Sequence, residues 1–322
     1  MKYILFNCGA TFHLAMYEDL GNNPNVIWCK KIQPSWLCRL RDLHTSIRGN
    51  RVFSLPFQEI WNDTFFDNTK LAENEKAIFI FEEGNKQAYS PIYLRYVKER
   101  YPIAKLVFSF LNPSNSIGGK YLEFVERNYD MIVTFDKADS LKFGWYYYNG
   151  IYSKREIPNA SAPASDVLFI GQNKGRLDFA KKIYKYLSDS GVSCCFYITG
   201  VDESKVEHST GIFYNQYLDY ETVLNYVKNT KCILEILQEG QSGSTLRVME
   251  SLVYGKKLIT NNRGIVSERY YKSDQMKIIG LPEDIDIDFI LDGKSYIYDG
   301  GLSPIHFLKF IYDNLQLTEA IR

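Results

Sequence analysis

Residues 241–250 read Gln-Ser-Gly-Ser-Thr-Leu-Arg-Val-Met-Glu, and they follow the apolar run Cys-Ile-Leu-Glu-Ile-Leu at residues 232–237. An apolar run of strand length, a turn of small residues and a helical pattern that ends near Tyr254 and Gly255 make one β–α unit. At such a helix start, free backbone N–H groups and the positive end of the helix dipole form a site for an anion.

The same alternation of strand and helix extends to both sides of this segment. In the second half we expect strands at residues 166–170, 193–198, 231–237 and 257–260, and helices at 174–188, 220–228 and 244–254. In the first half we expect strands at residues 3–6, 26–29, 77–81, 105–110 and 131–135, and helices at 35–47, 91–100 and 120–128. Two successive doubly wound α/β domains with parallel sheets are the predicted fold class.

A small, polar segment bounded by prolines, residues 158–165, separates the two halves as a linker does. We expect a first domain over residues 1–157, a second over 158–303, and a helix over 304–322 that packs back on the first domain. That helix has a clear start, because Ser303 can cap it and Pro304 suits the first helical position. One stripe of the helix is apolar, formed by Ile305, Leu308, Ile311 and Leu315.

Composition limits the class of protein. The 322 residues are 45% hydrophobic and carry a formal net charge of zero, which argues against a nucleic-acid binder. The first apolar run is too short for a signal peptide or a membrane span, so a cytoplasmic protein is expected. The six cysteines show no metal-ligand spacing and predict buried thiols.

One stretch, residues 28–51, is both basic and aromatic. It contains one acid, Asp42, and two tryptophans, Trp28 and Trp36; its six basic residues are Lys30, Lys31, Arg39, Arg41, Arg48 and Arg51. Such a stretch suits peripheral association with an anionic membrane, here the cytoplasmic face of the inner membrane. An ordinary solvated helix face explains the same charges.

Two loops are candidates for holding a diphosphate. The loop after the strand at 166–170 offers Gly171, Lys174, Gly175 and Arg176 at the carboxyl end of that strand, where α/β sheets bind ligands. A tight turn with exposed cations explains the same residues.

In the segment quoted first, we expect the N–H groups of Gly243, Ser244 and Thr245 and the two hydroxyls to meet phosphate. Arg247 can pair with phosphate, and Glu250 can accept from ribose hydroxyls. An N-capped helix with an Arg–Glu pair at i, i+3 is the alternative.

These motifs together resemble bacterial GT-B-type glycosyltransferases, in particular those of capsular polysaccharide and lipopolysaccharide assembly. The matching pieces, which cover residues 166–263 well and the first half weakly, are Phe-Ile-Gly-Gln-Asn-Lys-Gly-Arg at 169–176, Tyr-Leu-Asp-Tyr-Glu at 217–221, residues 240–250, and Gly-Lys-Lys-Leu-Ile-Thr at 255–260. The resemblance implies two Rossmann-like lobes that face a cleft, with the donor nucleotide in the second lobe.

For the site, the resemblance implies that Tyr217 and Leu218 hold the base and that Glu250 holds the ribose, beside the loop of Gln241 and Ser242. It implies a UDP-, GDP- or CMP-sugar as donor substrate, a carbohydrate or a polyprenyl- or other lipid-linked acceptor, no bound cofactor, and no required metal. Many retaining members carry a glutamate eight residues before the position of Glu250. Ser242 stands there, so the resemblance implies no stereochemical outcome.

An inverting transferase needs a general base beside the acceptor hydroxyl. The first half offers His13, Glu82, Glu83 and Asp136, each after an expected strand, where the site of a parallel sheet opens. The triplet Asp284, Asp286 and Asp288 could hold a metal, but it suits the acidic first turn of a helix better.

The hypothesis is therefore a glycosyltransferase of surface polysaccharide assembly. Two alternatives of similar architecture remain: a nucleotide-sugar 2-epimerase, and a non-catalytic nucleotide-binding partner in an assembly complex.

Overall fold

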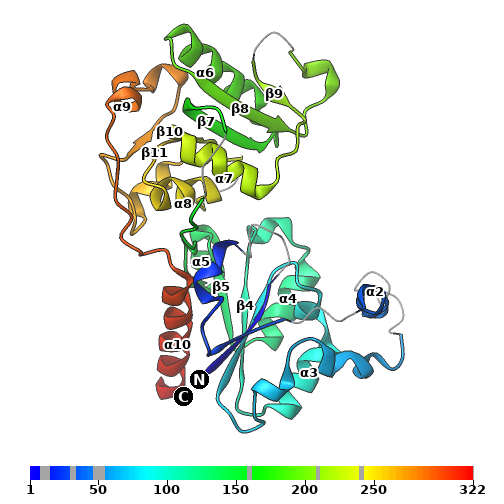
Figure 1. Ribbon diagram of the computed structural model, residues 1–322. Coiled ribbons are helices and arrows are strands. Elements are labelled where there is room, and N and C mark those ends of the chain that lie inside the picture. The colour runs from blue at the N-terminus through cyan, green and yellow to red at the C-terminus, as the bar shows by residue number, and fades with distance from the viewer. Residues whose placement is uncertain are drawn as a thin grey trace. The chain divides into compact units, whose positions relative to one another are not determined.

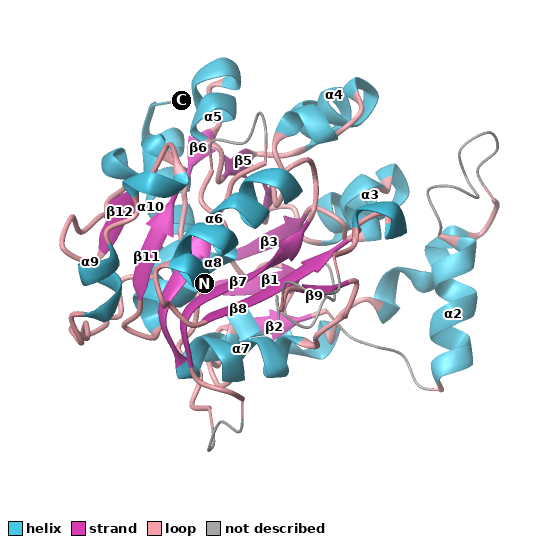
Figure 2. Ribbon diagram, turned by 90° about the horizontal axis from the view of Figure 1, so that it is seen from above, coloured by secondary structure: helices cyan, strands magenta, loops and turns pink. Residues whose placement is uncertain are grey.

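A computed structural model describes residues 1–7, 15–29, 34–45, 55–157, 162–207, 211–238 and 243–321. Contacts divide the chain into two compact units, which are described separately. Unit 1 comprises Met1–Asn149 and Ile305–Arg322, and unit 2 comprises Gly150–Pro304. Each unit is a parallel sheet with helices around it (Figures 1 and 2).

The sheet of unit 1 has six strands in the order β2-β1-β3-β4-β5-β6, and every neighbouring pair is parallel. Its strands are β1 (Lys2–Phe6), β2 (Val26–Trp28), β3 (Ala77–Glu82), β4 (Lys105–Ser109), β5 (Met131–Thr134) and β6 (Tyr146–Tyr147). Strand β3 is buried along its whole length, as its unbroken apolar run predicts for a central strand covered on both faces.

The helices of unit 1 are α2 (Ser35–His44), α3 (Pro91–Arg100), α4 (Gly119–Asn128), α5 (Lys137–Phe143) and α10 (Pro304–Ile321). Figure 1 shows α3 and α4 on one side of this sheet and α10 on the other. The α3 side is filled by aromatic rings, including the stacked pair Phe6 and Phe81. On the other side, the Phe307 and Phe310 rings of α10 pack on Tyr148.

The sheet of unit 2 also has six parallel strands, in the order β12-β11-β10-β7-β8-β9. These are β7 (Ser165–Gln172), β8 (Cys194–Thr199), β9 (Phe213–Tyr214), β10 (Thr230–Glu235), β11 (Lys257–Thr260) and β12 (Met276–Ile278). Numbered within the unit, the order 3-2-1-4-5-6 is that of a Rossmann fold.

Four helices flank the sheet of unit 2: α6 (Leu177–Asp189), α7 (Tyr220–Asn229), α8 (Leu246–Val253) and α9 (Ile287–Leu291). Successive strand residues face opposite sides. Val167 and Phe169 therefore pack in one cluster with α6 and α9, and the buried residues of α7 and α8 lie outside that cluster. The predicted class, two doubly wound Rossmann-like α/β domains, is confirmed.

Two predicted helix starts and one predicted helix face differ from the structure. Helix α6 begins at Leu177, later than residue 174, because Lys174 and Gly175 have positive φ angles of 39° and 83°, which no right-handed helix accommodates. Helix α8 begins at Leu246 because Thr245 is its N-cap. In α10, Ile305 is 51% exposed and Phe307 is buried in its place.

Four short helices and strands of the structure were not predicted from the sequence, namely α5, β6, β9 and β12. Strands β6 and β9 have two residues each, too few to show an alternating pattern.

The first crossing between the units also falls earlier along the chain than the expected boundary at residue 157. Residues 150–157 have their contacts in unit 2. There the Tyr152 N–H donates to the Leu302 carbonyl at 2.7 Å, so the segment that enters unit 2 pairs with the segment that leaves it. Of the expected linker, residues 158–161 lie outside the described residues.

Candidate functional site

The strand order of unit 2 reverses between β7 and β10, which are neighbours in the sheet. From this pair the chain proceeds outward in opposite directions, so the loops that follow the two strands separate and leave a crevice at their carboxyl ends. The loop after β7 contains residues 173–176, and the segment after β10 leads to α8. Both predicted diphosphate loops therefore belong to the strands that flank the crevice.

Arg176 joins the ends of these two strands. Its guanidinium donates to the Gln172 carbonyl at 2.8 Å and to the Ile236 carbonyl. The side chain lies over Gly171, where a Cβ atom would come within 2.8 Å of Arg176 Nη2. Burial lowers the pKa of Arg176, and the nearby Glu235 opposes that shift. The structure thus gives this predicted phosphate ligand a bridging role between β7 and β10.

Glu235, the last residue of β10, is 1% exposed and organises the start of α8. Its Oε1 accepts from the Thr245 N–H at 2.9 Å and from the Thr245 hydroxyl at 2.7 Å. Its Oε2 accepts from the Thr260 hydroxyl at 2.6 Å. Burial raises the pKa of Glu235, while the bonds from Thr260 and Thr245 and the charge of Arg176 lower it.

The polar groups at the start of α8 are bound within the protein. Thr245 Oγ1 accepts from the Arg247 N–H at 3.2 Å, which makes Thr245 the N-cap. Ser244 is buried, and its hydroxyl accepts from the Tyr270 hydroxyl at 2.8 Å. Gly243 is buried as well, and Gln241 and Ser242 lie outside the described residues. The hydroxyls that we expected to meet phosphate therefore hold this turn in place.

Arg247 and Glu250 pair with each other, as their i, i+3 spacing allows. Arg247 Nη1 and Glu250 Oε2 are 2.7 Å apart, with side chains 14% and 0% exposed. Both atoms are buried, and among the described residues each has only this ion pair as a partner. Burial raises the pKa of Glu250, and Arg247 and the Tyr220 hydroxyl lower it.

Two tyrosines complete this buried group. The Tyr220 hydroxyl donates to Glu250 Oε1 at 3.0 Å, and it also bonds to the Tyr152 hydroxyl. Burial and the Glu250 charge raise the pKa of both phenols, so both keep their protons at neutral pH. No sequence pattern points to Tyr152, because it lies 98 residues before Glu250 in the chain, in the segment that enters unit 2.

The remaining predicted ligands of unit 2 face solvent. Lys174 is exposed at the tip of the loop after β7, and Tyr217 is 86% exposed in the loop that follows β9. Leu218 is half-buried beside it. A cation and an aromatic ring are therefore available to a ligand at the carboxyl edge of this sheet.

In unit 1 the strand order reverses between β1 and β3. Of the four predicted bases, His13 follows β1 but lies outside the described residues. Glu82, the last residue of β3, is 3% exposed. The loop after β1 is held to the loop after β3, since Asn85 Nδ2 donates to the Asn7 carbonyl at 2.9 Å. Glu82 thus stands at the crevice of this sheet.

The two other carboxylates hold backbone. Glu83 Oε2 accepts from the N–H groups of Leu111 at 2.8 Å and Asn112 at 2.7 Å. Asp136 Oδ1 accepts from the N–H groups of Ala138 and Asp139 and caps α5. These bonds give Glu83 and Asp136 a structural role at their loops.

Two members of the acidic triplet, Asp284 and Asp286, hold backbone N–H groups at helix starts. Asp284 accepts from the N–H groups of Gly280 and Leu281, and Asp286 accepts from the Phe289 N–H at the start of α9. Within the described ranges, no group of three or more His, Cys, Asp or Glu side chains is placed to hold a metal ion.

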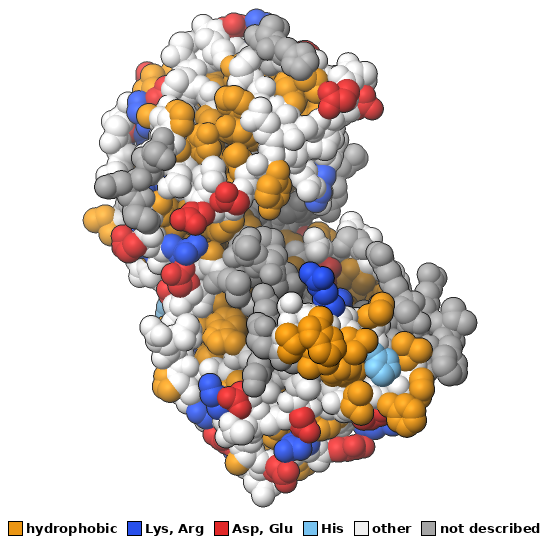
Figure 3. All heavy atoms as spheres, turned by 45° about the vertical axis from the view of Figure 1, so that its right-hand side comes forward, with side chains coloured by type: hydrophobic (Ala, Val, Ile, Leu, Met, Phe, Trp, Pro, Cys, Tyr) orange, Lys and Arg blue, Asp and Glu red, His pale blue; other side chains and the backbone are white. Residues whose placement is uncertain are grey.

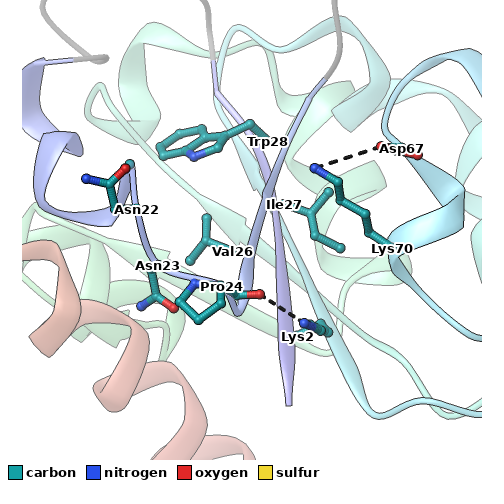
Figure 4. Close-up of a pocket in the computed structure, with 10 residues that line it drawn as sticks. Lys2, Asn22, Asn23, Pro24, Val26, Ile27, Trp28, Asp67 and Lys70 are labelled. Carbon is teal, nitrogen blue, oxygen red and sulfur yellow. Dashed lines mark hydrogen bonds and ion pairs between the residues drawn. The ribbon is translucent and has the colours of Figure 1, made fainter.

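Unit 1 also has an open pocket (Figure 4). It lies at the edge of the sheet opposite the carboxyl ends of the strands, where Glu82 stands. Lys2 and Val26, the first residues of β1 and β2, line it together with Trp28. The Lys2 ammonium donates to the Pro24 carbonyl at 2.9 Å, and Lys70 pairs with Asp67 at 3.8 Å. Because this pocket is at the amino ends of the strands, it is separate from the crevice at Glu82.

A comparison with protein-family models matches none of them, and a search of curated proteins finds no match. Several solved structures are similar. The UDP-forming α,α-trehalose-phosphate synthase of Burkholderia xenovorans is 12% identical with a TM-score of 0.44, over 83% of this chain and 79% of that one. AviGT4, a glycosyltransferase involved in avilamycin A biosynthesis, is 11% identical with a TM-score of 0.48, over 84% of this chain and 72% of that one. An α-glucosyltransferase in complex with UDP and a mismatched DNA is 12% identical with a TM-score of 0.45, over 85% of this chain and 80% of that one.

Proposed function

We propose that this protein is a glycosyltransferase that moves a sugar from a nucleotide-sugar to a carbohydrate or lipid-linked acceptor in bacterial surface polysaccharide assembly. One observation carries the proposal. The segment that resembles the donor-binding motif of GT-B enzymes lies at the crevice of a Rossmann-ordered sheet, and it contains the buried pair Arg247 and Glu250. Burying a charged pair is costly unless further hydrogen bonds satisfy it, and among the described residues Arg247 Nη1 and Glu250 Oε2 have only each other, at 2.7 Å. Ribose hydroxyls, which both donate and accept, would supply further hydrogen bonds.

The proposed donor site places each part of a nucleotide against a different element. Tyr217 offers an exposed ring for the base, and Lys174 offers an exposed cation for the diphosphate. Glu235 and Arg176 act as positioning residues, since they fix α8 and the β7 loop to the strand ends.

A nucleotide panel tests the donor site in the full chain. Thermal unfolding with UDP, GDP, CMP and their sugars should reveal one stabilising nucleotide, and a ligand at 100 times its Kd adds about 2.7 kcal/mol. Lys174→Ala should lower the affinity for that nucleotide at least 10-fold, as measured by calorimetry. Lys182→Ala, an exposed lysine on α6, is the control. Absence of binding by every nucleotide would refute the proposal.

Product analysis separates the reaction classes. The transferase releases the donor's nucleotide (UDP, GDP or CMP) when an acceptor is present. An epimerised nucleotide-sugar formed without acceptor would establish the 2-epimerase instead. Nucleotide binding with no turnover on any carbohydrate or lipid-linked acceptor would establish a non-catalytic partner.

Among the described candidates, Glu82 is proposed as the general base, because it ends β3 at the point where the strand order of unit 1 reverses. Glu82→Gln should lower kcat at least 100-fold, within the usual contribution of a general base, and leave nucleotide affinity unchanged. A kcat near that of the wild type would exclude Glu82 as the general base.

Association with an anionic membrane through residues 28–51 is proposed from charge and from an apolar surface. Helix α2 exposes Trp36, Leu40 and Leu43, and the adjoining 3₁₀-helical region exposes Phe57 and Ile60, each between 48% and 74%. Figure 3 shows hydrophobic side chains gathered on one face of unit 1, and Figures 1 and 2 both place α2 at its periphery. Exposed apolar patches of this kind mark interaction surfaces. No helix in the described ranges is both long and apolar enough to span a bilayer.

Vesicle sedimentation tests this surface. Trp36→Ser with Leu43→Ser should reduce binding to vesicles that contain phosphatidylglycerol. Leu141→Ser is the control, because Leu141 is 80% exposed on α5. Equal sedimentation of the variant and the wild type would favour a solvated face.

A further inference from the structure

A second pocket lies in unit 2, away from the crevice between β7 and β10. It is lined by residues 154–157, by Lys228 at the end of α7, by residues 253–256 at the end of α8 and by residues 296–298. Its volume is ≈ 380 Å³, within the range of ligand sites, which begins at about 300 Å³. Helices α7 and α8 end at this pocket, and β10 and β11 begin beside it. The pocket is thus at the amino edge of the sheet, one helix length from Thr245.

Basic side chains dominate the wall of this pocket. Four of its lining residues are basic and one, Glu156, is acidic; the basic ones are Lys154, Arg155, Lys228 and Lys256. They come from separate parts of the chain, because Lys154 and Arg155 belong to the segment that enters unit 2, whereas Lys228 and Lys256 lie at the ends of α7 and α8. Cations are favourable at helix ends, but that effect accounts for two of the four.

Two of the ammonium groups are held in fixed positions. Lys228 Nζ donates to the Ile157 carbonyl at 2.6 Å, and Lys256 Nζ donates to the Lys228 carbonyl at 2.6 Å. A carbonyl is neutral, so these bonds orient the ammonium groups without cancelling their charge. Each ammonium has three donors, which leaves donors for a ligand.

The arrangement brings like charges together in a partly buried place. Burial, and then the charge of Lys228, lower the pKa of Lys256. Both causes disfavour the charged form, and a bound anion would relieve both. The backbone leaves little freedom here, because a Cβ atom on Gly255 would meet the Tyr296 carbonyl. The chain therefore maintains a preformed, electropositive pocket.

We infer that this pocket binds a phosphate group of an anionic ligand. The four basic lining residues exceed the one acidic residue by three, which is enough to balance a phosphate monoester with its charge of about −1.5 to −2 at neutral pH. Lysines bind phosphate as point charges. Neither the nucleotide loops nor Glu82 contributes to the pocket, so this site stands whether or not the proposed function holds. The phosphate can belong to a soluble phosphorylated compound or to a lipid headgroup.

Calorimetry of the full chain with inorganic pyrophosphate tests the site. The double variant Lys228→Gln with Lys256→Gln should bind pyrophosphate at least 10-fold more weakly, or should lose one of the binding events that the wild type shows. Lys182→Gln with Lys185→Gln on α6, also a loss of two surface charges, should leave binding unchanged. A second pocket variant, Lys154→Gln with Arg155→Gln, should give the same loss if the first does not fold. Equal pyrophosphate binding by a folded pocket variant and the wild type, with no difference on vesicles, overturns the inference.

Vesicles of phosphatidylcholine with phosphatidylglycerol identify the source of the phosphate. The pocket variants and the wild type all keep α2 unchanged. If the pocket variants sediment less with these vesicles than the wild type does, the site binds a lipid headgroup. Equal sedimentation together with a pyrophosphate difference assigns it to a soluble compound.

Discussion

At the scale of single residues, the structure changes what Arg247 and Glu250 are expected to do when replaced. As surface ligands they could be removed at little cost in stability. Glu250 is instead fully buried and paired with Arg247 and Tyr220. Removing one partner of a buried ion pair typically costs about 3–5 kcal/mol, because the other charge is left uncompensated. A loss of nucleotide binding in Glu250→Ala would therefore combine the loss of a ligand contact with the loss of folding stability.

Tyrosine substitutions on α7 measure the Glu250 environment more cleanly. Tyr220→Phe removes a hydrogen bond to a buried carboxylate, and such bonds contribute about 1.5–3 kcal/mol. Tyr226→Phe is the matched control on the same helix, since its hydroxyl bonds only to the neutral Tyr197 hydroxyl at 2.8 Å among the described contacts. Urea unfolding should show the larger loss for Tyr220→Phe. Equal losses would mean that Glu250 draws no support from Tyr220.

Glu235 should make stability depend on pH. Its folded pKa is raised by burial, above the unfolded value of about 4.3. Between those two values the folded state binds more protons than the unfolded state, so the free energy of unfolding falls as pH rises. The stability of the wild type relative to Glu235→Gln should therefore be smaller at pH 7.5 than at pH 5, by urea unfolding. Glu126→Gln, on the exposed side of α4, is the control, and an unchanged difference would contradict the assignment.

At the scale of elements, the start of α8 is fixed by tertiary contacts as well as by local ones. The sequence pattern predicts a helix after Gly243, and Thr245 is a good N-cap by residue type. The cap is locked by a carboxylate on β10, ten residues earlier. A turn held in this way keeps its shape without ligand, which would let the proposed nucleotide site bind with little rearrangement.

Thr245→Ala should therefore cost more than an ordinary cap. Loss of an N-cap alone costs about 0.5–2 kcal/mol, and here Glu235 also loses the bond from the Thr245 hydroxyl. Ser90→Ala is the comparison, because Ser90 caps α3 through the Tyr93 N–H. We expect urea unfolding to show a larger loss for Thr245→Ala, and calorimetry to show weaker nucleotide binding for it alone. A nucleotide affinity equal to that of the wild type would remove the link between this turn and the proposed site.

At the scale of the whole molecule, the last helix belongs with the first unit. The chain leaves unit 1 at Asn149 and returns at Ile305, so that unit 1 is built from both ends of the chain. Helix α10 buries Phe307, Leu308, Ile311 and Leu315 there. Unit 1 is thus incomplete until the segment following unit 2 has packed.

Truncation before Pro304 should destabilise unit 1 severely. Four buried apolar side chains at about 1.5–3 kcal/mol each amount to roughly 6–12 kcal/mol, comparable to the full stability of a domain. Circular dichroism and limited proteolysis of the truncated chain should show loss of unit 1 structure. A chain that ends at residue 316 keeps all four side chains and should remain folded. Native-like protection of unit 1 without α10 would contradict this account.

The sequence by itself determined the fold class, because the alternation of apolar runs with amphipathic helices is a local property of the chain. It also made the segment around α8 and the loop after β7 candidates for a ligand site, since small residues at strand ends are visible in the sequence. Tertiary structure decided which polar atoms are used internally. Glu235 with Thr260, Ser244 with Tyr270, and Tyr152 with Tyr220 are pairs distant in the chain and brought together by the parallel sheet and its returning segments. No local pattern encodes such pairs, because hydrogen bonding and burial depend on neighbours that only the folded chain supplies.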